Sequence, residues 1–167
     1  MDDADDGTHV RTPTLEDVGR IGRSFNEAKA RYVLIGGFAV IAQGSGRTTK
    51  DIDLLVDPSA ENVARVKAGL GILADNAAAE IEEDDIEQYT VVRVADEVMV
   101  DLLGKACDVT YEDAVAEAKE VVLGGVPIPV ASKETLIRTK QTVRPADQMD
   151  CDFLRSLLEE DRRRKKS

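Results

Sequence analysis

The sequence has few of the residues on which several common kinds of active site depend. Its 167 residues include one histidine, two cysteines and no tryptophan. His9 lies near the N-terminus, and Cys107 and Cys151 are far apart, so neither forms part of a metal-type CxxC motif. The sequence therefore excludes zinc sites of the Cys/His type, histidine-based catalysis and Ser-His-Asp triads.

Long apolar runs and a basic, apolar N-terminus are also lacking. No apolar segment approaches the roughly 18 residues that a membrane-spanning helix needs. The first six residues include four aspartates, where a secretory signal would have basic residues followed by an apolar stretch. We therefore expect a cytoplasmic protein without a membrane segment.

The rest of the composition is that of a soluble globular protein. Hydrophobic residues make up 43% of the chain and charged residues 33%, and 167 residues are enough for one core but not for two. We expect one domain over residues 1–167, with a core over about 14–160, a flexible acidic N-terminal tail over 1–12 and a flexible basic C-terminal tail over 161–167.

The net charge of −11 is unevenly distributed, because residues 162–166 are all basic. An acidic body repels nucleic-acid backbones, so RNA is a less favoured partner. The basic end could attract phosphates, or it could be a solvated tail that keeps the chain soluble.

Apolar spacing and turn signals predict an α/β fold of the α+β kind, in which helices flank a small mixed β-sheet and two helices end the chain. Predicted helices cover about 14–30, 38–43, 59–73, a segment from Ser132 through Lys140, and a segment from Pro145. Predicted strands cover 32–35 and 51–56, with hairpins of 89–94 with 98–103 and of 121–123 with 126–130. The last helix has an apolar stripe of Met149, Phe153, Leu154, Leu157 and Leu158. Residues 76–87, rich in alanine and acids, are predicted to form a mobile surface segment.

Two aspartates on one predicted strand indicate a metal site. Alternation along 51–56 places Asp51, Asp53 and Leu55 on the same face. Same-face neighbours lie about 6.6–7 Å apart, which lets two carboxylates bind one metal ion or a pair about 3.5–4 Å apart.

Asp101 interrupts an apolar strand, where an ionised carboxylate is costly unless it is paired. If this strand neighbours the strand of Asp51 and Asp53, three acids converge. At about 6 Å and an effective dielectric of about 20, each pair repels by about 2.8 kcal/mol and the trio by roughly 8 kcal/mol. A divalent cation would relieve this repulsion, and oxygen-only ligands favour Mg²⁺, with Mn²⁺ second.

Gly36 and Gly37 stand between an apolar strand and a predicted helix. Backbone N–H groups at such a turn can bind phosphate. A tight structural turn without a ligand explains the pair equally well.

Together these residues resemble the signature of the DNA polymerase β-like nucleotidyltransferases. That signature is an apolar residue, Gly, then Gly or Ser, about nine to thirteen residues, and Asp-apolar-Asp/Glu-apolar. Here Ile35-Gly36-Gly37, thirteen intervening residues and Asp51-Ile52-Asp53-Leu54 match it, with Asp101 as the third carboxylate. Over about residues 31–158 the chain is similar to the abortive-infection toxin and its relatives, through Arg47, Thr49, Lys140, Arg144, Asp147 and Asp150.

The resemblance implies in-line attack of an acceptor hydroxyl on the α-phosphate of an NTP. Asp51, Asp53 and Asp101 would be the catalytic, metal-binding residues. The residues expected to bind the nucleotide and its phosphates are Gly36, Gly37, Arg47, Thr49, Lys140 and Arg144, with Asp147 as an accessory residue. Lys140, Arg144 and Asp147 could equally be exposed helix charges. Many active relatives have Ser where this chain has Gly37. The glycine lacks the side-chain contact to phosphate that the serine would make, but the backbone contact remains.

Other functions fit the sequence less well. Phosphatases that form an aspartyl-phosphate have an apolar strand before their acids, whereas polar residues precede Asp51 here. A glycosyltransferase would need a longer nucleotide-binding part ahead of its motif. The alternative from a different class is a non-catalytic protein of the same fold that binds or regulates a partner, such as an antitoxin. For an enzyme, the acceptor could be a small molecule, a protein side chain or an RNA end.

Overall fold

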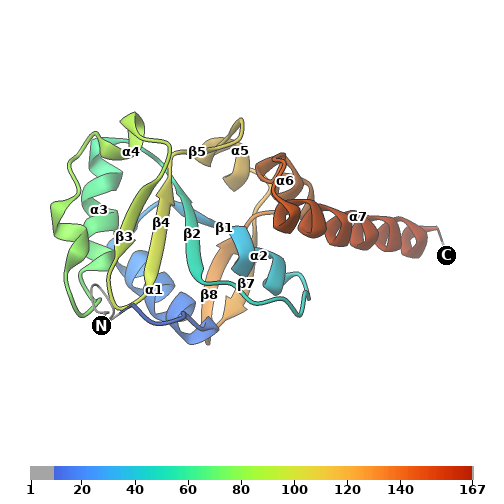
Figure 1. Cartoon of the computed structure of the whole chain (residues 1–167), viewed down its shortest axis with the longest axis horizontal. Coiled ribbons are helices and arrows are strands. Elements are labelled where there is room, and N and C mark those ends of the chain that lie inside the picture. The colour runs from blue at the N-terminus through green and yellow to red at the C-terminus, as the bar shows by residue number, and fades with distance from the viewer. Residues whose placement is uncertain (1–9, 167) are drawn as a thin grey trace.

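A six-stranded mixed sheet forms the centre of the molecule in the computed structural model, which describes residues 10–166 (Figure 1). Its strands lie in the order β3-β4-β2-β1-β8-β7. They are β1 (Tyr32–Ile35), β2 (Asp51–Val56), β3 (Val92–Ala95), β4 (Met99–Leu103), β7 (Lys119–Leu123) and β8 (Val126–Val130). A separate two-stranded sheet pairs β5 (Lys105–Ala106) with β6 (Val109–Thr110).

Helices surround this sheet, and both predicted hairpins, β3–β4 and β7–β8, are confirmed. The helices are α1 (Leu15–Ala28), α2 (Gly36–Ala42), α3 (Ala60–Leu70), η1 (Ala77–Glu80), α4 (Asp85–Gln88), α5 (Tyr111–Val115), α6 (Lys133–Thr139) and α7 (Pro145–Lys165). Helix α7 packs against α6 and then extends away from the body of the molecule (Figure 1). Lys140, predicted to lie within a helix, is the C-cap residue of α6.

The pairing of β2 with β4 positions the acidic residues. The two strands are parallel, and their register sets Asp53 beside Asp101. On its other side β2 pairs antiparallel with β1, which sets Asp53 beside Ile35, the last residue before the two glycines. Strand β2 therefore lies between the glycine turn and the strand of the third aspartate.

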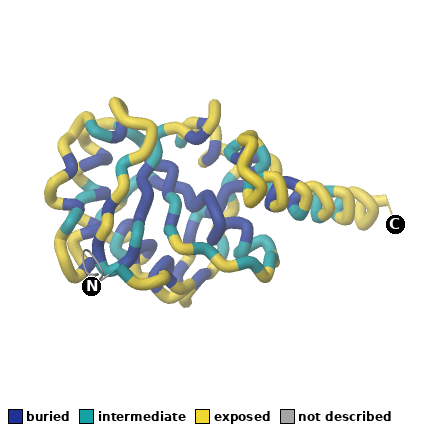
Figure 2. The backbone as a smooth tube through the Cα atoms, in the orientation of Figure 1, coloured by how far each residue is buried: buried dark blue, intermediate teal, exposed yellow. Residues whose placement is uncertain are grey.

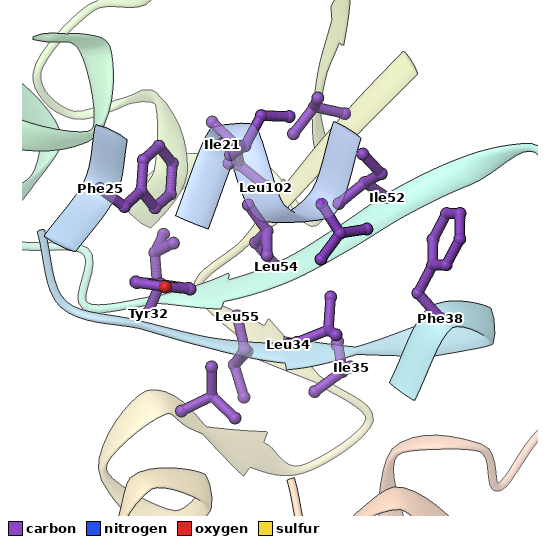
Figure 3. Close-up of a cluster of buried hydrophobic side chains, with 14 of the residues drawn as sticks. Ile21, Phe25, Tyr32, Leu34, Ile35, Phe38, Ile52, Leu54, Leu55 and Leu102 are labelled. Atoms are coloured by element: carbon purple, nitrogen blue, oxygen red, sulfur yellow. The ribbon is translucent and has the colours of Figure 1, made fainter. Parts of the chain in front are cut away.

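The alternation of β2 separates an apolar face from a polar one. Ile52 and Leu54 are almost fully buried, and they belong to the same core as Phe25 and Leu102 (Figure 3). Burial of such a side chain stabilises the fold by about 1.5–3 kcal/mol. These side chains anchor one face of the strand, and the opposite face presents Asp51 and Asp53 ahead of Leu55, which is also buried.

The predicted mobile segment over residues 76–87 is wrong in part. Ala78, Ile81 and Ile86 are buried in the core, and the segment contains η1 and α4. The carboxylate of Asp96 also accepts hydrogen bonds from the backbone N–H groups of Asp75 and Ala77, both at 2.8 Å. Three apolar side chains among the acids are enough to attach this segment to the core.

Residues 161–165 of the predicted C-terminal tail belong to α7, which continues through them. Its end is largely exposed (Figure 2), and ion pairs one helical turn apart, such as Glu160 to Arg164 at 2.9 Å, link its side chains. Met149 does not join the buried stripe of this helix and is 72% exposed. Residues 1–9 of the predicted N-terminal tail lie outside the described part of the chain. Within the described part of the predicted tail, Arg11 is anchored by a two-pronged contact with Asp17.

Candidate active site

Three carboxylates converge where β2 and β4 lie side by side. Asp51 and Asp53 come from β2 and Asp101 from the middle of β4. One oxygen atom from each carboxylate lies within 4.8 Å of the others. The parallel pairing that the sequence left conditional is present, so these three side chains can bind one cation together.

The local electrostatics oppose three ionised carboxylates. Burial, and after it the negative charges of Asp101 and Asp51, raise the pKa of Asp53 to about 7 from an ordinary value of 3.8. The positive charges of Lys140 and Arg93 act in the opposite direction. A bound cation would therefore favour the ionised form of Asp53.

Arg93, which no sequence pattern indicated, pairs with two of these carboxylates. Its Nε atom donates to Asp101 Oδ1 and one terminal nitrogen to Asp101 Oδ2, both at 2.8 Å. The same terminal nitrogen lies 3.4 Å from Asp51 Oδ2. Arg93 faces Asp101 in the β3–β4 hairpin. The predicted loop of residues 95–97 would have set Arg93 opposite Met99, whereas the register in the structure pairs Ala95 with Met99 and so brings Arg93 opposite Asp101.

Both glycines of the turn are required by close packing. Gly36 has a φ of +73°, and a Cβ atom on it would lie 2.1 Å from Asp53 Oδ2. A Cβ atom on Gly37 would lie 2.6 Å from both Cβ and Oγ1 of Thr49. The backbone of the turn thus lies directly against the Asp53 carboxylate on one side and the Thr49 side chain on the other.

Two basic residues near the acids share one buried carboxylate. Asp150, on α7, accepts a hydrogen bond from Arg47 and lies 3.0 Å from the Nζ atom of Lys140. Lys140 also lies 3.7 Å from Asp147, and only 7% of its side chain is exposed. Lys140 is therefore not an exposed helix charge, whereas Arg144 is exposed.

All the residues predicted for the site line a single cleft of about 650 Å³. They are Gly36, Gly37, Arg47, Thr49, Asp51, Asp53, Asp101, Lys140, Arg144 and Asp147. Arg93, Thr90, Val91, Lys105 and Cys107 also line it. The cleft has acids at its centre, glycine backbone on one side and basic groups around it, an arrangement suited to a cation with a polyphosphate.

This fold, with three aspartates on adjoining strands beside a Gly-Gly turn, defines the nucleotidyltransferase class. The chain belongs to a family of that class, because residues 14–166 match the family described as "Nucleotidyl transferase of unknown function (DUF2204)". The resemblance to the nucleotidyltransferase superfamily is thereby confirmed, and so is the enzyme class.

A solved structure supports the same fold. It is the crystal structure of a protein described as a "putative nucleotidyltransferase" from Thermotoga maritima, with a TM-score of 0.57 and 18% sequence identity. The alignment covers 87% of this chain and 92% of the other. A search of curated proteins found no match. Over residues 10–166, no helix combines the length and the apolar composition needed to cross a membrane.

Proposed function

We propose that this chain is a Mg²⁺-dependent nucleotidyltransferase that moves an NMP from an NTP to a hydroxyl acceptor. The observation that carries this proposal is the convergence of Asp51, Asp53 and Asp101 in a cleft that also contains the glycine turn and basic side chains. A non-catalytic binding protein has no need for three mutually repelling carboxylates.

The donor set fits a hard divalent cation. Asp51, Asp53 and Asp101 offer only oxygen atoms, which suits Mg²⁺ first and Mn²⁺ second. Bound there, the cation would neutralise phosphate charge and favour ionisation of an acceptor hydroxyl. The raised pKa of Asp53 supports this assignment, because a neighbouring cation offsets what burial and the other carboxylates cost.

The chain's own residues would position the triphosphate and neutralise its charge. Backbone N–H groups in the first turn of α2, at Gly36 and Gly37, have no partner within the helix and can donate to phosphate oxygens. Arg47, Lys140 and Arg144 supply positive charge around the same cleft. Thr49 contributes a hydroxyl at its wall.

In the proposed reaction the acceptor oxygen forms a bond to the α-phosphorus. The bond from that phosphorus to the bridging oxygen breaks in line, and pyrophosphate leaves with the electron pair. The acceptor's proton passes to the Asp101 carboxylate. The protein contributes mainly orientation and electrostatic stabilisation, as is usual for transfer of phosphorus groups.

Calorimetric titration with ATP, GTP, CTP and UTP tests this proposal, in Mg²⁺ and in EDTA. We expect at least one NTP to bind only with Mg²⁺, and Asp53→Asn to abolish that binding while circular dichroism shows an intact fold. Asp152→Asn is the matched control, since Asp152 is 82% exposed and lies outside the cleft. Binding that is unchanged in Asp53→Asn would exclude the metal site.

For the acceptor we favour a small hydroxylated molecule or a protein side chain over RNA. The body is acidic, and several basic residues at the end of α7 pair with neighbouring glutamates, such as Arg163 with Glu159 at 3.5 Å. A labelling reaction with an α-phosphate-labelled NTP and mixed acceptors separates the three classes. If RNA is the acceptor, deletion of residues 162–166 will weaken its binding and flatten the salt dependence.

The resemblance to abortive-infection toxins extends the proposal to a toxin–antitoxin setting in the cytoplasm, with an antitoxin protein as partner. We expect expression of the unmodified chain to slow growth of a host cell and Asp53→Asn to restore it. Equal growth with both chains would contradict the toxin role and leave the proposed enzyme activity untouched.

A further inference from the structure

Arg93 holds the same oxygen atoms that a cation at this site needs. Its guanidinium group binds both oxygens of Asp101 at 2.8 Å, in a two-pronged contact. It also reaches Oδ2 of Asp51 at 3.4 Å. Two of the three carboxylates that face one another are therefore already paired with a positive charge from the chain itself.

The two partners of this contact differ in their freedom to move. Asp101 has 9% of its side chain exposed and sits on β4, which is paired on both sides within the sheet. Arg93 is 55% exposed and comes from β3, which is the edge strand. Because its long side chain already borders solvent, Arg93 can leave the carboxylates without any opening of the core.

Charge makes simultaneous binding unfavourable. A divalent cation between Asp51, Asp53 and Asp101 would lie close to the guanidinium group, and the two positive charges repel each other. They also need the same oxygen atoms, since Arg93 engages both of those on Asp101. Without a cation, Arg93 reduces the mutual repulsion of the three carboxylates.

We propose that Arg93 is an internal counter-ion that a divalent cation displaces from Asp101 and Asp51. This proposal rests on the proposed function, because it assumes that the three aspartates bind the cation. It means that Arg93 lowers the affinity of the site for metal and stabilises the metal-free protein. Cation binding then releases the guanidinium group within the cleft, where the phosphates are expected.

The test compares Mn²⁺ binding to the purified full chain and to Arg93→Gln by electron paramagnetic resonance, without nucleotide. We expect the Kd for Mn²⁺ to fall at least about fivefold in Arg93→Gln, and its Tm in EDTA to fall below that of the unmodified chain. Arg155→Gln is the matched control, since it removes the same charge from an arginine of similar exposure, 57% against 55% for Arg93, that pairs with an aspartate outside the cleft. An Arg93→Gln variant that binds Mn²⁺ with equal or weaker affinity would overturn the proposal.

Arg93→Lys keeps the charge but cannot form the two-pronged contact. We expect its Mn²⁺ affinity to lie between those of the unmodified chain and Arg93→Gln. If Arg93→Gln does not fold, Arg93→Lys decides the question by the same criterion of tighter Mn²⁺ binding.

Asp53→Asn separates this proposal from the proposed function. If Mn²⁺ binding requires Asp53 but does not tighten in Arg93→Gln, only the role of Arg93 is wrong. If neither the unmodified chain nor Arg93→Gln binds Mn²⁺ through Asp53, the metal site itself is wrong, and both proposals fail.

Discussion

Gly36 lies so close to Asp53 that a Cβ atom on Gly36 would stand 2.1 Å from the Oδ2 atom of the aspartate. The backbone at Gly36 also has a φ of +73°, a conformation that L-residues with side chains rarely adopt. The glycine therefore serves two purposes: it permits the turn and it leaves room for the carboxylate. Its position connects the backbone proposed to bind phosphate directly to the acid proposed to bind metal.

Gly36→Ala should lower the free energy of unfolding by about 2 kcal/mol or more, through backbone strain and the clash with Asp53. It should also remove metal-dependent NTP binding, because Asp53 must move. Chemical denaturation and calorimetry measure the two effects. Gly46→Ala is the control, since a Cβ atom at Gly46 meets nothing within 4 Å. Equal behaviour of the two variants would show that the close approach does not matter.

Gly37 and Thr49 should be energetically coupled. A side chain on Gly37 would overlap Thr49, so Gly37→Ser alone should destabilise the protein by about 1–3 kcal/mol. Gly37→Ser combined with Thr49→Gly should cost less than the sum of the two single changes, with a coupling energy of about 0.5–3 kcal/mol. Urea denaturation of the four chains in this double-mutant cycle measures the coupling. Simple additivity would contradict the packing seen here.

Asp150→Asn should destabilise the protein by about 3 kcal/mol, because it leaves Lys140 buried without its nearest negative charge. NTP affinity should fall as well, since Arg47 and Lys140 lose the group that orients them. Asp161→Asn serves as the comparison: Asp161 is 42% exposed and pairs with Lys133, so its loss should cost less than about 1 kcal/mol. Thermal unfolding with and without NTP separates the structural effect from the binding effect.

Stability of the metal-free protein should fall as pH rises. Asp53 has a native pKa of about 7 against an ordinary value of 3.8. Between pH 3.8 and about pH 7, Asp53 is protonated in the native protein but ionised in the unfolded chain. The stability that this bound proton contributes is therefore lost as pH rises through the native pKa. Between about pH 5 and about pH 8 in EDTA, the Tm of the unmodified chain should fall by at least about 3 °C more than the Tm of Asp53→Asn. Parallel curves for both chains would show that the pKa of Asp53 is not raised.

Local sequence patterns predicted the elements that position the site. The sequence around the motif predicted a strand, a glycine turn, a helix and a second strand, and β1, α2 and β2 follow in that order. Alternation along β2 placed Asp51 and Asp53 on one face. These features depend on neighbours a few residues away, and such relations are visible in a single sequence.

Relations between distant segments were not visible in the same way. Nothing in the sequence alone required β2 to pair with β4, and the roles of Arg93 and Asp150 depend on that pairing and on the packing of α7. Residues 76–87 were misjudged because their average composition is polar, whereas Ala78, Ile81 and Ile86 alone decide how the segment packs. Whether a segment packs against the core depends on a few individual side chains, and the average composition of the segment does not reveal them.

The parallel pairing of β2 with β4 joins carboxylates that α3, η1, α4 and β3 separate along the chain. A shift of this pairing by one residue would turn Asp101 toward the opposite face of the sheet, where it could no longer meet Asp53. A cation that needs all three aspartates therefore binds only chains whose sheet has assembled correctly. At a concentration 100 times its Kd, such a ligand adds about 2.7 kcal/mol to the stability of those chains alone. The same ion that the proposed chemistry needs would thus also select correctly folded molecules from misassembled ones.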